Sequence, residues 1–161
     1  MNVTGNVRIH GIELSYQNSL APLGKLFRNL SCFANATFLD LEGSNDSDFS
    51  GYWPKTFNWG LSYASPRLLV QLNWNVKPAN PLQPKGSDPT RPIAWSNSRA
   101  VVSAAVEYRF AKHLSVYFTA DNLTDVPRVS YRYGSLTPDY AKNSGISAFG
   151  TDMTLGIKAK F

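Results

Sequence analysis

The chain has 161 residues, of which 43% are hydrophobic, and a formal net charge of +5. This length suits one ordinary domain, and no run approaches the roughly 18 consecutive apolar residues of a membrane-spanning helix. The 16 basic residues are scattered from Arg8 to Lys160 without the basic stripe of a nucleic-acid surface, so no nucleic-acid partner is expected. Cys32 is the single cysteine, which excludes an internal disulfide.

Residue types that carry catalysis or bind metals are sparse. His10 and His113 are far apart and have no acidic or cysteine partner at metal-ligand spacing. Asp46 and Asp48 lie in a polar segment and are expected to solvate it rather than to form a catalytic or calcium-binding pair. The sequence contains neither a Gly-x-Ser-x-Gly motif nor a phosphate-binding glycine loop. We therefore expect no enzyme activity, no metal site and no cofactor.

The first strand is predicted over residues 6–19, with a bulge near His10 and Gly11. Its apolar residues change face at that point, which a bulge explains most simply. Before the change they are Val7 and Ile9, and after it they are Ile12, Leu14 and Tyr16. Pro22 and Gly24 then indicate a turn.

Residues 30–41 are apolar enough for a second strand, but their facing stays open. Two alternating sets compete for the apolar side: Leu30, Cys32 and Phe38 against Phe33, Leu39 and Leu41. Residues 42–54 are polar and contain glycine and proline, so a long loop is expected there.

The middle and end of the chain predict five further strands. Residues 57–63 and 68–76 alternate around a tight turn at 64–66, which indicates a hairpin with one apolar face. Residues 102–110 and 114–121 form a similar pair around a turn at 111–113, with a kink at 122–125 and a continuation to Tyr133. The stretches 78–97, with its five prolines, and 134–150 are expected to be long loops. The last strand is predicted over residues 151–161.

Long and short connections alternate along this series without exception. Outer-membrane β-barrels have short periplasmic turns and longer extracellular loops, and their strands need only one apolar face. The alternation therefore favours such a barrel over a soluble sandwich. It also predicts an orientation, in which Phe161 lies on the periplasmic side.

Aromatic residues fall near both ends of the predicted strands, as expected for the two girdles of a membrane barrel. The predicted periplasmic girdle consists of Tyr16, Tyr63, Tyr108, Phe110 and Phe161. The aromatic residues towards the extracellular end are Phe57, Trp59, Trp74, Tyr131 and Tyr133.

The carboxyl terminus resembles the signal by which the assembly machinery recognises outer-membrane barrels. That signal is a polar residue, a glycine, a hydrophobic residue and a final aromatic residue at fixed spacing. Thr154, Gly156, Ala159 and Phe161 fit this pattern. The resemblance implies that the barrel assembly machinery is a partner.

The stretch Leu114 to Asp125, followed by Tyr131, Tyr133 and the terminal GIKAKF, resembles the carboxyl-terminal end of a TonB-dependent receptor. Residues 6–16 and 33–37 resemble the same family. Two features depart from it: Ala148-Phe149-Gly150 replaces a frequent Pro-Gly-Arg, and no plug domain or energy-coupling box is present.

The prediction is an all-β, antiparallel meander of about seven strands, the carboxyl-terminal segment of a large barrel of the 22-strand type. Residues 1–161 would form a partial barrel, with the plug domain and earlier strands outside this sequence. The family implies bacterial outer-membrane location, contact with lipid, and TonB-driven uptake of a scarce ligand such as a siderophore, another metal chelate or an oligosaccharide. The sequence does not identify the ligand or its binding residues.

Two other functions stay open. One is a secreted β-sandwich whose long loops bind sugar through Tyr52, Trp53 and Trp95. The other is a passive porin.

Overall fold

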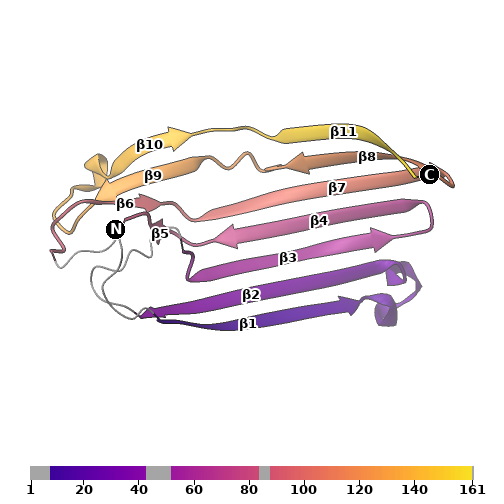
Figure 1. Ribbon diagram of the computed structural model, residues 1–161, viewed down its shortest axis with the longest axis horizontal. Coiled ribbons are helices and arrows are strands. Elements are labelled where there is room, and N and C mark those ends of the chain that lie inside the picture. Colours follow the sequence, from indigo (N-terminus) through magenta and orange to yellow (C-terminus); the bar gives the residue numbers. More distant parts are fainter. Residues whose placement is uncertain (1–7, 43–51, 84–87, 161) are drawn as a thin grey trace.

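The structure is a computed structural model that describes residues 8–42, 52–83 and 88–160. Its main feature is an antiparallel sheet of seven strands in the order β1-β2-β3-β4-β7-β8-β11 (Figure 1). This confirms the predicted meander. The strands are β1 (Arg8–Ser19), β2 (Leu30–Glu42), β3 (Lys55–Ala64), β4 (Leu68–Lys77), β7 (Arg99–Ala111), β8 (Leu114–Asp121) and β11 (Asp152–Ala159). The described residues contain no helix long and apolar enough to cross a membrane.

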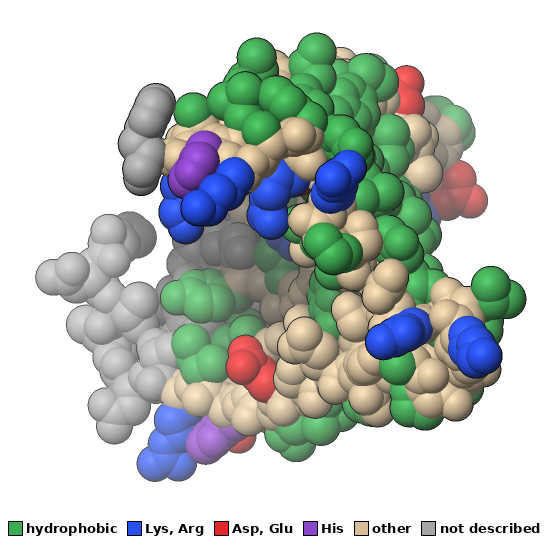
Figure 2. All heavy atoms as spheres, turned by 90° about the vertical axis from the view of Figure 1, so that its right-hand side faces the viewer, with side chains coloured by type: hydrophobic (Ala, Val, Ile, Leu, Met, Phe, Trp, Pro, Cys, Tyr) green, Lys and Arg blue, Asp and Glu red, His purple; other side chains and the backbone are tan. Residues whose placement is uncertain are grey.

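One face of this sheet is apolar from the first strand to the last. Leu72 lies opposite Leu61 on one side and Ala104 on the other, and directly paired residues point to the same face. The same register places Val106 beside Phe118 and Phe118 beside Leu155. Figure 2 shows hydrophobic side chains over the convex side of the curved sheet, with Lys and Arg side chains bordering the hollow.

Strand pairing decides the facing of β2, which the sequence leaves open. Cys32 lies opposite Leu61, and Phe38 lies opposite Ile12, so the set with Leu30 belongs to the apolar face. Phe33 and Leu39 are on the polar face, where each is half-buried. These two side chains lie over glycines of the neighbouring strands, Gly60 and Gly11.

The bulge predicted near His10 and Gly11 is wrong. The pairing of β1 with β2 runs without a shift from Arg8 to Ser19. Ile9 therefore lies on the polar face opposite Leu41, and the two apolar residues contact each other there. A register shift occurs instead at Phe110, between Arg109 and Ala111.

The alternation of short and long connections is confirmed. Residues 20–29, 65–67 and 112–113 connect strands at one end of the sheet, and the long connections lie at the other (Figure 1). The first short connection contains the two 3-10 turns η1 (Ala21–Leu23) and η2 (Lys25–Phe27).

Two predicted loops contain short strands, which corrects the prediction over 78–97 and 134–150. A second, four-stranded sheet has the order β10-β9-β6-β5. Its strands are β5 (Asn80–Pro81), β6 (Ile93–Ser96), β9 (Arg128–Tyr133) and β10 (Asn143–Ser147), and a 3-10 turn η3 (Asp139–Ala141) precedes β10. β6 follows Pro92 and has a weak local strand signal, and its pairing with β9, far away in the chain, holds the small sheet together.

The predicted kink at 122–125 is confirmed and separates the two sheets. β8 ends at Asp121 and β9 begins at Arg128, and the residues Asn122 and Asp125 between them have φ of 57° and 47°. The Asn122 amide nitrogen donates to the Gly150 carbonyl at 2.9 Å, which ties the kink to the start of β11.

Candidate functional site

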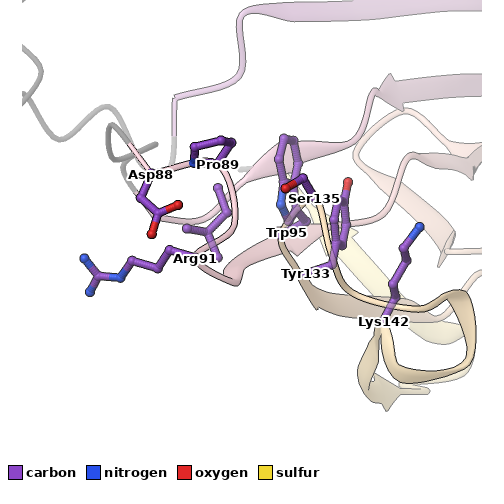
Figure 3. Close-up of a pocket in the computed structure, with 9 residues that line it drawn as sticks. Asp88, Pro89, Arg91, Trp95, Tyr133, Ser135 and Lys142 are labelled. Carbon is purple, nitrogen blue, oxygen red and sulfur yellow. The ribbon is translucent and has the colours of Figure 1, made fainter.

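The small sheet carries a pocket of about 410 Å³ at the end of the molecule that holds the long connections (Figure 3). β6 and β9 form its floor, and the segments before β6 and after β9 form its sides. Its lining residues are Asp88, Pro89, Arg91, Ile93, Trp95, Tyr133, Gly134, Ser135 and Lys142. A concave site with aromatic walls and a few convergent polar groups is typical of small-molecule binding.

Two stacked aromatic rings form the floor of the pocket. The ring centroids of Trp95 and Tyr133 are 5.2 Å apart and their planes differ by 9°. Trp95 pairs with Tyr131, and Ile93 pairs with Tyr133, so Trp95 and Tyr133 are diagonal neighbours on one face of the small sheet. Because each ring covers one face of the other, this aromatic platform leaves only outer ring faces and ring edges for a ligand.

Charged side chains stand on both sides of this platform (Figure 3). Lys142 Nζ lies 5.4 Å from the Tyr133 ring centroid, within the range of a cation–π interaction. The same nitrogen is 2.6 Å from the Asp139 carboxylate, and this hydrogen bond lowers the pKa of Asp139. Arg91 is exposed on the opposite side of the platform.

Among the described residues, Asp88 is the one acidic residue that lines the pocket. Its carboxylate accepts hydrogen bonds from the Thr90 hydroxyl at 2.6 Å and from the Thr90 backbone nitrogen at 2.9 Å. These bonds hold the pKa of Asp88 below its ordinary value, so the group is ionised at neutral pH. Two cations, Arg91 and Lys142, and two anions, Asp88 and the Asp139 that is bonded to Lys142, therefore lie around the aromatic platform.

The residues of the predicted assembly signal lie along β11. Thr154 pairs with Thr119 and Gly156 with Tyr117 on the polar face, whereas Ala159 pairs with Leu114 on the apolar face. A Cβ at Gly156 would lie 2.5 Å from the Tyr117 hydroxyl oxygen and Cζ. Phe161 lies outside the described residues.

The predicted periplasmic girdle residues Tyr16, Tyr63, Tyr108 and Phe110 all lie in the strand ends next to the short connections. Tyr16, Tyr108 and Phe110 are exposed. At the opposite end, Trp59 and Trp74 stack with centroids 6.5 Å apart. Tyr131 and Tyr133 belong to the small sheet instead of the large one, and Tyr133 lines the pocket.

The three aromatic residues predicted for a sugar site come from neighbouring segments but have different surroundings. Lys77 Nζ lies 5.7 Å from the Trp53 ring centroid. The Asn80 amide donates to the Tyr52 carbonyl at 2.8 Å, whereas Trp95 stacks on Tyr133.

Histidines, cysteines and carboxylates do not gather in groups of three that could hold a metal ion within the described residues. His10 lies in β1 near the long connections, and His113 lies in the short turn before β8. Asp46 and Asp48 lie outside the described residues.

The family described as TonB dependent receptor-like, beta-barrel, matches residues 1–123, more than half of the chain. The chain therefore belongs to this family of receptors, whose barrels lie in the bacterial outer membrane. The apolar convex face is accordingly the lipid face, and the concave face is the lumen side. No curated protein matches the sequence.

Among solved structures, the chain is similar to the siderophore receptor PiuA from Acinetobacter baumannii. The similarity covers 98% of this chain with a TM-score of 0.64 and 15% sequence identity, and it shows the fold. The chain spans 22% of the length of that protein.

Sequence reasoning missed Arg91, Lys142 and the pairing of Trp95 with Tyr133. The two aromatic residues are far apart in the chain and meet only because β6 pairs with β9. The one local signal was the apolar run Ile93-Ala94-Trp95, which has strand propensity but lies among prolines.

Proposed function

We propose that this chain is the carboxyl-terminal part of the barrel of a receptor that takes up a scarce ligand across the outer membrane with energy delivered through TonB. The observation that carries this proposal is the Trp95–Tyr133 pocket, which lies at the end of the sheet opposite the short turns. The chain that holds this pocket belongs to a family of receptor barrels. Barrels of this kind place short turns in the periplasm. The pocket thus faces the medium from which a ligand arrives.

The pocket suits a ligand that has a flat face and carries polar or charged groups. An outer face of the stacked indole and phenol rings can bind a planar group or the apolar face of a sugar ring. Arg91 supplies a cationic side chain that could pair with an anionic metal chelate, whereas the charge of Lys142 is balanced by Asp139 at 2.6 Å. The solved neighbour is itself named as a siderophore receptor, which supports the same ligand class.

Energy coupling would involve parts outside residues 1–161. In this proposal a plug domain contacts TonB, and these seven strands supply part of the barrel wall and one side of the ligand entrance. The barrel assembly machinery and membrane lipid are the other expected partners. A passive porin would need no energy source, which separates it from this proposal.

The test measures uptake of radiolabelled ferric chelates and labelled oligosaccharides by cells that make the full-length receptor. Uptake of one class should require active TonB, and Trp95→Ala with Tyr133→Ala should weaken it. Phe118→Ala is the matched control, because Phe118 is an aromatic residue of the lipid face. Uptake that continues at the same rate without TonB would contradict the proposal and favour a porin.

A further inference from the structure

The connection between β1 and β2 exposes large apolar side chains beside two cations. Leu26 is 90% exposed and Leu23 is 68% exposed, and Phe27 is exposed as well. Lys25 and Arg28 lie between and after these residues and are also exposed. Residues 20–29 contain no acidic side chain.

This connection is fixed to the end of the sheet. The Leu20 nitrogen donates to the Leu30 carbonyl at 2.8 Å, and the Ala64 nitrogen donates to the Asn29 carbonyl at 2.9 Å. The two 3-10 turns lie between these two hydrogen bonds in the chain. The exposure of the leucines therefore belongs to an ordered segment with a defined place beside β3.

The connection is also continuous with the lipid face. Tyr16 and Leu30, which flank it in β1 and β2, lie on that face. Figure 1 shows the connection at the same end as the other short turns, and Figure 2 views the molecule from this end. In the barrel family this end meets the periplasmic leaflet.

We propose that residues 20–29 form a lipid contact in which Leu23, Leu26 and Phe27 enter the periplasmic leaflet. Lys25 and Arg28 bind the phosphates of anionic phospholipids at its surface. Apolar residues interleaved with cations are the pattern of segments that lie in the membrane interface, and basic residues next to a membrane attract anionic lipid. The absence of acidic residues from the segment favours lipid phosphate as the partner. This proposal depends on the barrel family and not on the transported ligand.

The depth of residue 26 in the membrane tests this proposal. The full-length receptor is prepared with Cys32→Ser and with any other cysteines removed. A spin label is then attached at Leu26→Cys, and the receptor is placed in phosphatidylcholine bilayers. We expect this label to be reached by oxygen more readily than by a water-soluble nickel chelate. Leu136→Cys is the matched control, because Leu136 is 78% exposed at the opposite end of the molecule and should show the reverse preference. A label at position 26 that behaves like the one at 136 would overturn the proposal.

A second comparison tests the role of charge. Adding phosphatidylglycerol should move the label at position 26 deeper, and Lys25→Gln with Arg28→Gln should abolish that movement. Arg128→Gln with Arg132→Gln, at the extracellular end, should leave it unchanged. An equal response in both double variants would contradict headgroup binding, and spin–spin broadening that grows with receptor concentration would show that a second copy covers the segment instead of lipid.

Discussion

The phenol ring of Tyr117 in β8 occupies the space where a side chain at Gly156 in β11 would lie. A Cβ at position 156 would be 2.5 Å from the Tyr117 hydroxyl oxygen and 2.6 Å from Cε1. The two residues are directly paired on the lumen side. The glycine of the predicted assembly signal therefore has a packing partner within the barrel.

This contact predicts that Gly156→Ala impairs barrel folding and that Tyr117→Ala restores it. The close atoms are at the far end of the Tyr117 side chain, so a shift of the ring relieves part of the contact, and the cost should lie at or below the lower end of the about 1–3 kcal/mol of core overpacking. The folded fraction in outer-membrane extracts can be measured by heat-modifiable gel mobility. Gly145→Ala is the control, because a Cβ at Gly145 meets nothing within 4 Å. A double variant as defective as Gly156→Ala alone would show that the assembly machinery, and not Tyr117, requires this glycine.

A charge on the lipid face should cost far more than one on the lumen face. Leu72 and Asn73 are neighbours in β4, and Leu72 belongs to the apolar face whereas Asn73 pairs with Ser103 on the polar face. Leu72→Arg should destabilise the full-length barrel by about 2–4 kcal/mol near the membrane midplane. Asn73→Arg should cost much less. Denaturant titration into lipid bilayers measures both values, and equal penalties would contradict the assignment of the two faces.

The kink between the two sheets should depend on Asn122. Its side-chain oxygen accepts from the Val126 nitrogen at 3.0 Å, and its amide nitrogen donates to Gly150 at 2.9 Å. Asn122→Ala loses both bonds, at about 0.5–1.5 kcal/mol each, and also strains a residue with φ of 57°. Asn122→Gly loses the bonds alone and should be milder.

Hydrogen exchange in β9 and β10 is the measurement for the kink. Exchange there should accelerate most in Asn122→Ala, less in Asn122→Gly, and little in Thr124→Ala, whose hydroxyl makes only a 3.5 Å bond to Ala100. Unchanged exchange in Asn122→Ala would show that the small sheet is held by other contacts.

Deletion of Phe161 should reduce the amount of receptor in the outer membrane without changing its affinity for ligand. The prediction rests on the match of the terminal residues to the assembly pattern, and an aromatic residue at an interface buries only part of its area. Surface abundance and ligand affinity per surface molecule are measured together. Unchanged abundance with weaker affinity would place Phe161 in a binding site.

The alternation of apolar and polar residues predicted the strands of the large sheet because one face of this sheet meets lipid along its whole length and the other meets the lumen. Val70, Leu72, Trp74 and Val76 alternate with the polar residues Gln71, Asn73 and Asn75, and no partner is needed to recognise such a strand. β2 is different, since Phe33 and Leu39 are apolar residues on the polar face. Only the pairing with β3 and β1 shows that they cover Gly60 and Gly11.

The pocket was beyond sequence reasoning because distant pairing creates it. The residues next to Trp95 and Tyr133 in the sequence form no recognisable binding motif, and Lys142 comes from a third segment. The wrong prediction of a bulge near His10 also arose because the strand partner was unknown. Ile9 was assigned to the apolar side because isoleucine is apolar, whereas Leu41 gives it an apolar partner on the other face.

Lipid exposure along β4 tests the central claim most directly. Single spin labels at successive positions from Leu68 to Lys77 of the full-length receptor are placed in lipid bilayers, and their accessibility to oxygen is compared with that to a water-soluble nickel chelate. A lipid-facing barrel strand predicts that the preference for oxygen alternates with a period of two, with maxima at 68, 70, 72, 74 and 76. A preference that is uniform along the strand, or maxima at the odd-numbered positions, would contradict the assignment of this chain to an outer-membrane barrel wall with its apolar face in lipid.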